Sequence, residues 1–119
     1  MIEIASHSEG ILQKDISVNQ SISTKYLDQI IASLKASGLV KRVSGKRSGY
    51  ILARTPEEIS VYDIYKAFEH ELNVGDCPTK TSECILIGQC EIQNYWCDLN
   101  TTIENHMRSK TLDHILKDN

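Results

Sequence analysis

The feature that most constrains this chain is an amphipathic helix followed at once by a glycine and a basic hairpin. Residues 24–37 are predicted to form the helix because apolar side chains recur there at helical spacing, at Tyr26, Leu27, Ile30, Ile31 and Leu34. Ser23 is a suitable N-cap, and Gly38 is a residue type that ends helices. Beyond the glycine, the apolar runs LVKRV and YIL flank the basic loop SGKRSG, a pattern typical of a β-hairpin.

A shorter helix is predicted over residues 12–19, with a tight turn over residues 20–23. Leu12, Ile16 and Val18 are expected on its apolar side. Short helix, turn, amphipathic helix and hairpin is the order of a winged helix-turn-helix. In that fold the second helix enters the DNA major groove, and the hairpin reaches the adjacent minor groove or backbone. We therefore predict a mainly α-helical fold with a small β-hairpin wing.

The charge of the chain is unevenly distributed, although the formal net charge is only −3. Residues 1–56 hold eight Lys and Arg against four acidic residues, whereas residues 57–119 hold five against twelve. A basic half that meets a polyanion is the functional interpretation of this asymmetry. A solvated surface with uneven charge is the alternative.

The exposed side of the second helix carries side chains that suit DNA. Hydroxyls and lysines bind phosphate oxygens, Gln can pair with adenine, and Asp can accept a hydrogen bond from cytosine. The candidates on the helix are Ser23, Thr24, Lys25, Asp28 and Gln29. The candidates on the hairpin, whose cationic tip suits a narrow minor groove, are Arg42, Gly45, Lys46 and Arg47. The alternative is that these side chains form an ordinary solvated surface.

The second half of the chain returns to helical spacing. Helices are predicted over residues 61–72, 91–107 and 111–117, with a loop over residues 74–89. The buried stripe of the first of these is expected to be Val61, Ile64, Tyr65 and Phe68. The stripe of the long helix has no sequence-adjacent partner in so small a chain, so we expect it to pair with its twin across a two-fold axis. Its residues are Ile92, Tyr95, Trp96, Leu99 and Ile103.

Four cysteines, Cys77, Cys84, Cys90 and Cys97, follow the predicted wing with six, five and six residues between them. Thiolates are soft ligands for iron–sulfur clusters or zinc, but the sequence lacks the CxxC pair of a zinc ribbon. Buried inert cysteines and metal-free redox thiols are the alternatives. On one helix Cys90 and Cys97 would lie about 10 Å apart, which is too far for a single zinc ion.

Several classes of protein are disfavoured by what the sequence lacks. No apolar run approaches the roughly 18 residues of a membrane span, and MIEIASHSEG is not a secretory signal. The cysteines do not suggest a secreted disulfide scaffold, so we expect a cytoplasmic protein. The sequence has no GxSxG, HExxH, P-loop or GxGxxG motif, and nothing in it supports an enzyme.

The joined pattern resembles the Rrf2 family of bacterial regulators across nearly the whole chain. The resemblance rests on ISTKYLDQIIASLKASGLVKRVSGKRSGYILARTPEEISVYDIYKAFE, the three spaced cysteines, NYW and KTLDHIL. It implies a homodimeric winged-helix transcription factor that binds a double-stranded DNA operator, with the long helix as the dimer element. Many members bind a 2Fe–2S or 4Fe–4S iron–sulfur cluster, whose state changes DNA affinity.

The resemblance also assigns roles by position. Cys77, Cys84 and Cys90 match the cluster cysteines of the family. Tyr26 joins the DNA-facing residues, and Asp28 resembles the residue by which some members discriminate between DNA sites. Gly45 and Gly49 match glycines of the family's wing.

Three departures from the family pattern qualify these roles. Gln93 stands where some members place a histidine ligand, which leaves the fourth ligand open between Cys97, a partner-subunit residue and a small molecule. The chain begins later than the first helix of the family, so that helix is expected to be truncated. Ser44 and Ser48 replace an arginine and a glycine common in the wing.

These observations predict three segments: residues 1–70 as the winged helix-turn-helix, residues 71–90 as a sensor loop, and residues 91–119 as the dimerisation helix with a short C-terminal helix. The predicted function is a DNA-binding transcriptional regulator that senses iron–sulfur, redox or nitrosative status through a cysteine-ligated cluster. The alternatives are a cluster-free regulator controlled by thiols or a partner, and a protein-interaction module that has lost DNA binding.

Overall fold

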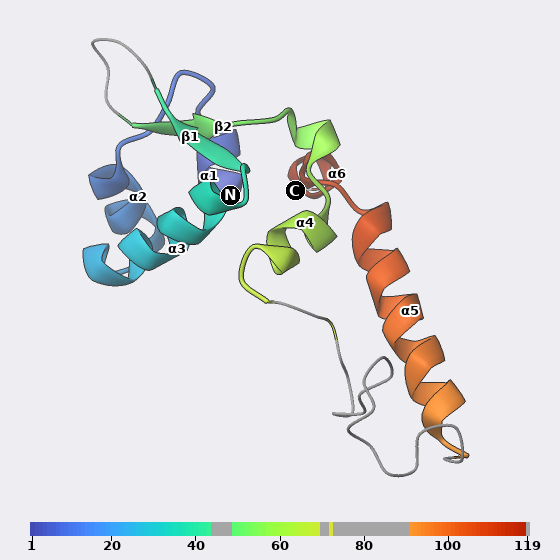
Figure 1. Ribbon diagram of the computed structural model, residues 1–119. Coiled ribbons are helices and arrows are strands. Elements are labelled where there is room, and N and C mark those ends of the chain that lie inside the picture. The colour runs from blue at the N-terminus through green and yellow to red at the C-terminus, as the bar shows by residue number, and fades with distance from the viewer. Residues whose placement is uncertain (44–48, 70–71, 73–90, 119) are drawn as a thin grey trace.

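The computed structural model describes residues 1–43, 49–69, 72 and 91–118 of the chain (Figure 1). The prediction of a mainly α-helical fold with a small β-hairpin is confirmed. The elements in order are α1 (Ile2–Ala5), α2 (Gln13–Gln20), α3 (Thr24–Ala36), β1 (Val40–Arg42), β2 (Tyr50–Leu52), the 3-10 helix η1 (Pro56–Glu58), α4 (Val61–Lys66), α5 (Gln93–Ser109) and α6 (Leu112–Lys117).

Helices α2 and α3 form the helix-turn-helix. Ser21 adopts a left-handed conformation with φ 53°, which turns the chain between the two helices. The Oγ of Ser23 then accepts a hydrogen bond from the backbone N–H of Tyr26, which confirms the predicted N-cap. Gly38, at φ +73°, follows the end of α3 as predicted. The buried face of α3 consists of Leu27, Ile31 and Leu34.

Strands β1 and β2 form an antiparallel hairpin in which Arg42 pairs with Tyr50. Ile11 pairs with the other edge of β2, since its N–H donates to the Tyr50 carbonyl at 3.1 Å and its own carbonyl accepts from Tyr50 at 2.9 Å. Glycine is required at Gly49, because φ is +142° and a Cβ would lie 2.8 Å from the Ile11 carbonyl oxygen. The hairpin is thereby fixed to the loop between α1 and α2.

The hydrophobic core joins residues from both ends of the chain. Leu39, Ile59 and Leu112 are its most completely buried large side chains. Leu112 begins α6, and its N–H donates to the carbonyl of Ile59 at 2.8 Å. The N–H of Val61 in turn donates to the carbonyl of Lys110 at 2.9 Å. The last helix therefore packs into the same core as the helix-turn-helix.

The long helix α5 projects away from this core, and the described chain measures 60 × 30 × 25 Å (Figure 1). Its C-terminal end is attached to α4, where the Cζ of Arg108 lies 4.0 Å from the centre of the Tyr62 ring. Glu104, one turn earlier, pairs with Arg108 at 3.0 Å. Among the described residues, these contacts tie α5 to the winged helix at its C-terminal end.

Two local predictions are wrong. Helix α4 ends at Lys66 rather than at residue 72, and its predicted stripe is not fully buried. Val61, Ile64 and Tyr65 are half-buried, and Phe68, which lies beyond the end of the helix, is 46% exposed. Leu12 and Val18 are 42% and 70% exposed, since only Ile16 of the short helix α2 reaches the core. The loop predicted over residues 74–89 lies outside the described residues.

Candidate nucleic-acid interface

The predicted DNA-facing residues of α3 lie together at its N-terminal end. All of them are exposed, and the largest, Tyr26, is 58% exposed. They occupy the first turns of the helix, while Leu27, Ile31 and Leu34 anchor its opposite side in the core. The residues are Ser23, Thr24, Lys25, Tyr26, Asp28 and Gln29. A helix held in this way presents hydroxyl, amide, carboxylate and ammonium groups on one accessible surface.

Asp28 has a partner that the sequence did not suggest. The side-chain Nε2 of Gln13, at the start of α2, donates a hydrogen bond to Oδ1 of Asp28. The same nitrogen lies 3.5 Å from the backbone carbonyl oxygen of Thr24. These contacts therefore join the start of α2 to the exposed side of α3. The two residues are fifteen positions apart on different helices, so helical spacing could not have revealed the contact.

Strand β1 of the hairpin carries two exposed cations. Lys41 and Arg42 are exposed on β1, and the guanidinium carbon of Arg42 lies 5.9 Å from the centre of the Tyr50 ring. At that distance a cation–π contact orients the arginine without removing its charge from solvent. The predicted DNA contacts Gly45, Lys46 and Arg47 lie outside the described residues.

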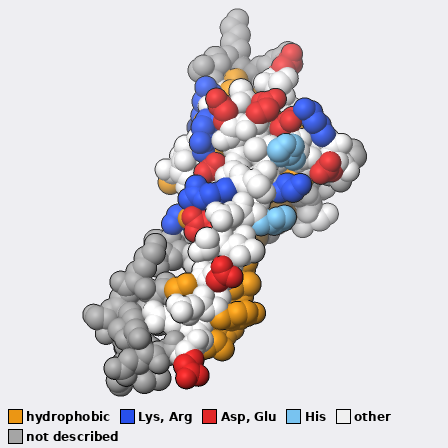
Figure 2. Space-filling view, turned by 90° about the vertical axis from the view of Figure 1, so that its right-hand side faces the viewer, with side chains coloured by type: hydrophobic (Ala, Val, Ile, Leu, Met, Phe, Trp, Pro, Cys, Tyr) orange, Lys and Arg blue, Asp and Glu red, His pale blue; other side chains and the backbone are white. Residues whose placement is uncertain are grey.

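The predicted dimer stripe of α5 is only partly covered. Ile92 and Tyr95 are 51% and 59% exposed, whereas Trp96, Leu99 and Ile103 are half-buried. The rings of Tyr95 and Trp96 meet edge to face with their centres 5.3 Å apart. Figure 2 shows hydrophobic side chains gathered along one side of the molecule's lower half, over α5. None of the residues of α5 is fully buried by the described part of the chain.

Of the four cysteines considered as cluster ligands, only Cys97 lies among the described residues. Cys97 is a free, half-buried cysteine in α5, while Cys77, Cys84 and Cys90 lie outside the described residues. Over the ranges that the structure describes, no three His, Cys, Asp or Glu side chains are grouped so as to hold a metal ion. Cys97 could therefore join a metal centre only with ligands from beyond those ranges.

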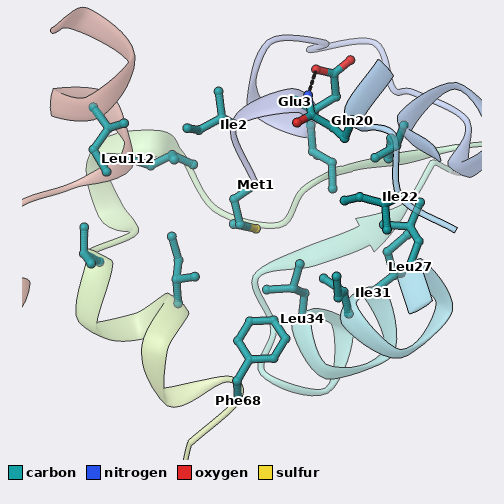
Figure 3. Close-up of a pocket in the computed structure, with 16 residues that line it drawn as sticks. Met1, Ile2, Glu3, Gln20, Ile22, Leu27, Ile31, Leu34, Phe68 and Leu112 are labelled. Carbon is teal, nitrogen blue, oxygen red and sulfur yellow. Dashed lines mark hydrogen bonds between the residues drawn. The ribbon is translucent and has the colours of Figure 1, made fainter. Parts of the chain in front are cut away.

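A cavity of about 500 Å³ lies on the buried side of α3, between α1, α2 and α4 (Figure 3). Its walls are mostly aliphatic and include Ile22, Ile31, Leu34 and Leu112. At its rim Gln20 donates to the Glu3 carboxylate at 2.9 Å.

Burial and hydrogen bonding shift two pKa values beside this cavity. Asn19 donates to the other carboxylate oxygen of Glu3 at 2.6 Å, and this bond is the main cause that lowers the pKa of Glu3. Burial lowers the pKa of the Met1 amino group.

In the described residues, no helix has the length and apolarity to cross a membrane.

Comparisons with known proteins agree with this architecture. The family model of Rrf2, described as an iron-dependent transcriptional regulator, matches residues 1–118. The HTH-type transcriptional regulator IscR of Pectobacterium atrosepticum is 33% identical over 118 residues, which cover 98% of this chain and 71% of the relative. These relatives are transcriptional regulators, not enzymes.

Two solved structures show the same fold. IscR of T. potens is 34% identical with a TM-score of 0.75, and the match covers 98% of this chain and 77% of that one. CymR, the global cysteine regulator of B. subtilis, has a TM-score of 0.78 at 24% identity, covering 99% of this chain and 88% of that one. The family match extends over nearly every residue described above, from the helix-turn-helix to the last helix. The chain therefore belongs to the Rrf2 family of winged-helix transcriptional regulators.

Proposed function

We propose that the protein is a homodimeric, cytoplasmic regulator that reads DNA with the exposed N-terminal turns of α3. The observation that carries this proposal is the exposure of every predicted contact residue of α3, opposite a buried apolar face. Ser23, Thr24 and Lys25 bind phosphate oxygens, and the Tyr26 hydroxyl, which is exposed beside them, adds a further contact. Gln29 pairs with adenine, and Asp28 accepts a hydrogen bond from cytosine N4.

The wing supplies the second contact with the duplex. Arg42 stands exposed at the end of β1, and the cation–π contact with Tyr50 orients it. Gly45, Lys46 and Arg47 follow it in sequence and add two further cations. Cations of this kind bind the backbone or a narrow minor groove, where the negative potential is enhanced.

The dimer forms through the apolar stripe of α5. Its residues Ile92, Tyr95, Trp96, Leu99 and Ile103 lie at helical spacing, and the two most exposed, Ile92 and Tyr95, are at the end of α5 farthest from the core. A second copy that buries these side chains places two α3 helices on one duplex, as paired half-sites require. Because Arg108 ties α5 to α4, the angle of α5 sets the distance between the two α3 helices.

The sensing element is an iron–sulfur cluster held by Cys77, Cys84 and Cys90. The support is the family's description as iron-dependent and the likeness to IscR. Thiolates are the usual ligands of such clusters, and a bound cluster supplies redox and oxygen sensitivity. The fourth ligand stays open, and Cys97 is the described candidate. Since this thiol belongs to α5 itself, a cluster that used it as the fourth ligand would be linked directly to the dimer helix.

Anaerobic purification with a visible spectrum, iron count and sulfide count tests the sensing element. We expect a brown protein with iron and sulfide bound. A colourless, iron-free preparation would contradict the cluster and favour a cluster-free regulator, for which the likeness of the fold to CymR is the supporting observation.

DNA binding is tested separately, by binding-site selection from random DNA followed by mobility shifts at several salt concentrations. We expect Lys46→Ala with Arg47→Ala to weaken binding to all sequences and to reduce the salt slope by about 0.9 for each phosphate that is no longer neutralised. Lys110→Ala with Lys117→Ala removes the same charge far from the wing and serves as the matched control. Absence of any binding by the wild type at low salt would instead support the interaction module.

A further inference from the structure

The carboxylate of Asp28 is exposed but held in position. Gln13 is half-buried at the first position of α2, and its Nε2 donates to Oδ1 of Asp28. The same Nε2 lies 3.5 Å from the carbonyl oxygen of Thr24, one turn before Asp28 in α3. The glutamine amide is thus fixed by its backbone position, by partial burial and by two acceptors on the neighbouring helix.

A carboxylate held in this way differs from an ordinary surface carboxylate. An ionised carboxylate has two oxygens and only accepts hydrogen bonds. When the Gln13 amide holds Oδ1, Oδ2 and the remaining lone pairs are left to accept a donor from a base. The side chain also loses part of its rotational freedom before DNA arrives, which reduces the entropy lost on binding.

We propose that Gln13 is a positioning residue for base discrimination: it orients Asp28 so that one carboxylate oxygen is directed at the major-groove edge of the operator. This proposal rests on the proposed docking of α3 and names a residue outside the predicted DNA-contact set. Gln13 itself reads no base, and its effect on binding passes entirely through Asp28.

The substitution Gln13→Met tests this role because methionine keeps the length and apolar packing of glutamine but removes the amide donor. We expect it to reduce the preference at the base pair that Asp28 reads by about two- to tenfold, the range for removal of one hydrogen bond. Asp28→Ala should abolish that preference entirely. The readout is binding-site selection from random DNA, followed by competition between duplexes that differ only at that base pair.

The chain offers a matched control at the other end of α2. Gln20 also donates from Nε2 to a carboxylate, that of Glu3 at 2.9 Å, but it lies beside the cavity behind α3 (Figure 3). We expect Gln20→Met to leave base preference unchanged. An equal effect of Gln20→Met would overturn the proposal, because it would show that removing any glutamine side-chain hydrogen bond of α2 disturbs recognition.

The double variant decides whether Gln13 acts through Asp28. In the Asp28→Ala background, Gln13→Met should have no further effect on base preference, and a further effect would overturn the proposal by showing a direct DNA contact. A readout without DNA is the NMR signal of the Gln13 side-chain amide, which should shift in Asp28→Ala and not in Gln29→Ala. If that shift occurs while Asp28→Ala leaves base preference intact, the docking of α3 has failed rather than the hydrogen bond between Gln13 and Asp28.

Discussion

Helices α3 and α5 are both amphipathic, yet among the described residues only α3 has its apolar side covered by the core. Three residues of α3 are fully buried in the core, whereas none of α5 is buried by the described residues, and Ile92 and Tyr95 are more than half exposed. The same amphipathic spacing of apolar residues therefore serves a different purpose in each helix. The stripe of α3 holds the helix against the core with its polar side exposed, whereas the stripe of α5 is partly exposed, as the proposed dimer requires.

The largest expected effect is a loss of stability when a core residue is truncated and α5 is left unchanged. Leu112→Ala should lower the free energy of unfolding by about 2–5 kcal/mol, because a fully buried leucine is replaced by a cavity. Leu99→Ala is the matched substitution on the stripe of α5, where the leucine is only half-buried. Urea unfolding at protein concentrations well below the dissociation constant of the dimer measures the monomer. There the free energy of unfolding should decrease less for Leu99→Ala than for Leu112→Ala. Equal decreases for both leucines would remove the distinction between the two helices.

The next effect belongs to the exposed stripe. Tyr95→Glu should weaken dimerisation roughly 30-fold or more, since an aromatic residue that anchors an interface contributes about 2 kcal/mol or more. Analytical ultracentrifugation over a concentration series measures the change. Asn94→Glu introduces the same charge on the opposite side of α5 and should leave the dimer intact. A wild-type chain that stays monomeric at micromolar concentrations would refute the use proposed for this stripe.

The sequence predicted those parts of the fold that local signals determine. The Ser23 cap, the span of α3, the glycine after it and the hairpin all depend on residues within a few positions of one another. The burial of Phe68 and the apolar side that was to include Leu12 and Val18 were wrongly predicted, because both stripes were extended beyond the one or two turns that meet the core. For short helices, tertiary packing decides which apolar residue is covered.

For the candidate site, too, the sequence predicted features within one helix but not contacts between helices. The period of α3 predicted the exposure of five DNA-facing residues, Ser23, Thr24, Lys25, Asp28 and Gln29. It wrongly assigned Tyr26 to the apolar stripe, and only the family resemblance placed Tyr26 among the DNA-facing residues. The hydrogen bond of Gln13 with Asp28 and the contact of Arg108 with Tyr62 join residues from different helices. Such pairs depend on how helices pack, which the spacing of residues along one chain does not reveal.

A smaller effect concerns the attachment of α5 to the winged helix. The contact of Arg108 with the Tyr62 ring at 4.0 Å should contribute a small favourable coupling, because solvent weakens an exposed cation–π pair. A double-mutant cycle with Arg108→Met and Tyr62→Leu measures that coupling by urea unfolding. If the attachment also sets the spacing of the two α3 helices, either variant should lower affinity for a full operator more than for a half-site. An equal decrease on both duplexes would limit the contact to stability.

The smallest expected effect is a pH dependence of the free energy of unfolding. It arises at the contact between α1 and α2 and does not involve α5. Asn19 and Gln20 hydrogen-bond the Glu3 carboxylate, and the first of these bonds chiefly lowers its pKa below the ordinary value of 4.5. The folded state therefore binds this proton less tightly than the unfolded state. The resulting stabilisation is present above the unfolded pKa and disappears as pH falls through the lower folded value.

Unfolding by urea between about pH 6 and pH 3 checks this dependence. The stability difference between the wild type and Glu3→Gln should be largest near pH 6 and should narrow as the carboxylate is protonated. Glu69→Gln, at an exposed position beyond α4, should show a difference that does not narrow in the same way. A constant difference for Glu3→Gln would mean that the two amides do not distinguish the charged carboxylate from the neutral one. The contacts of α2 with α1 would then stabilise the fold by packing alone, as the apolar wall of the neighbouring cavity does.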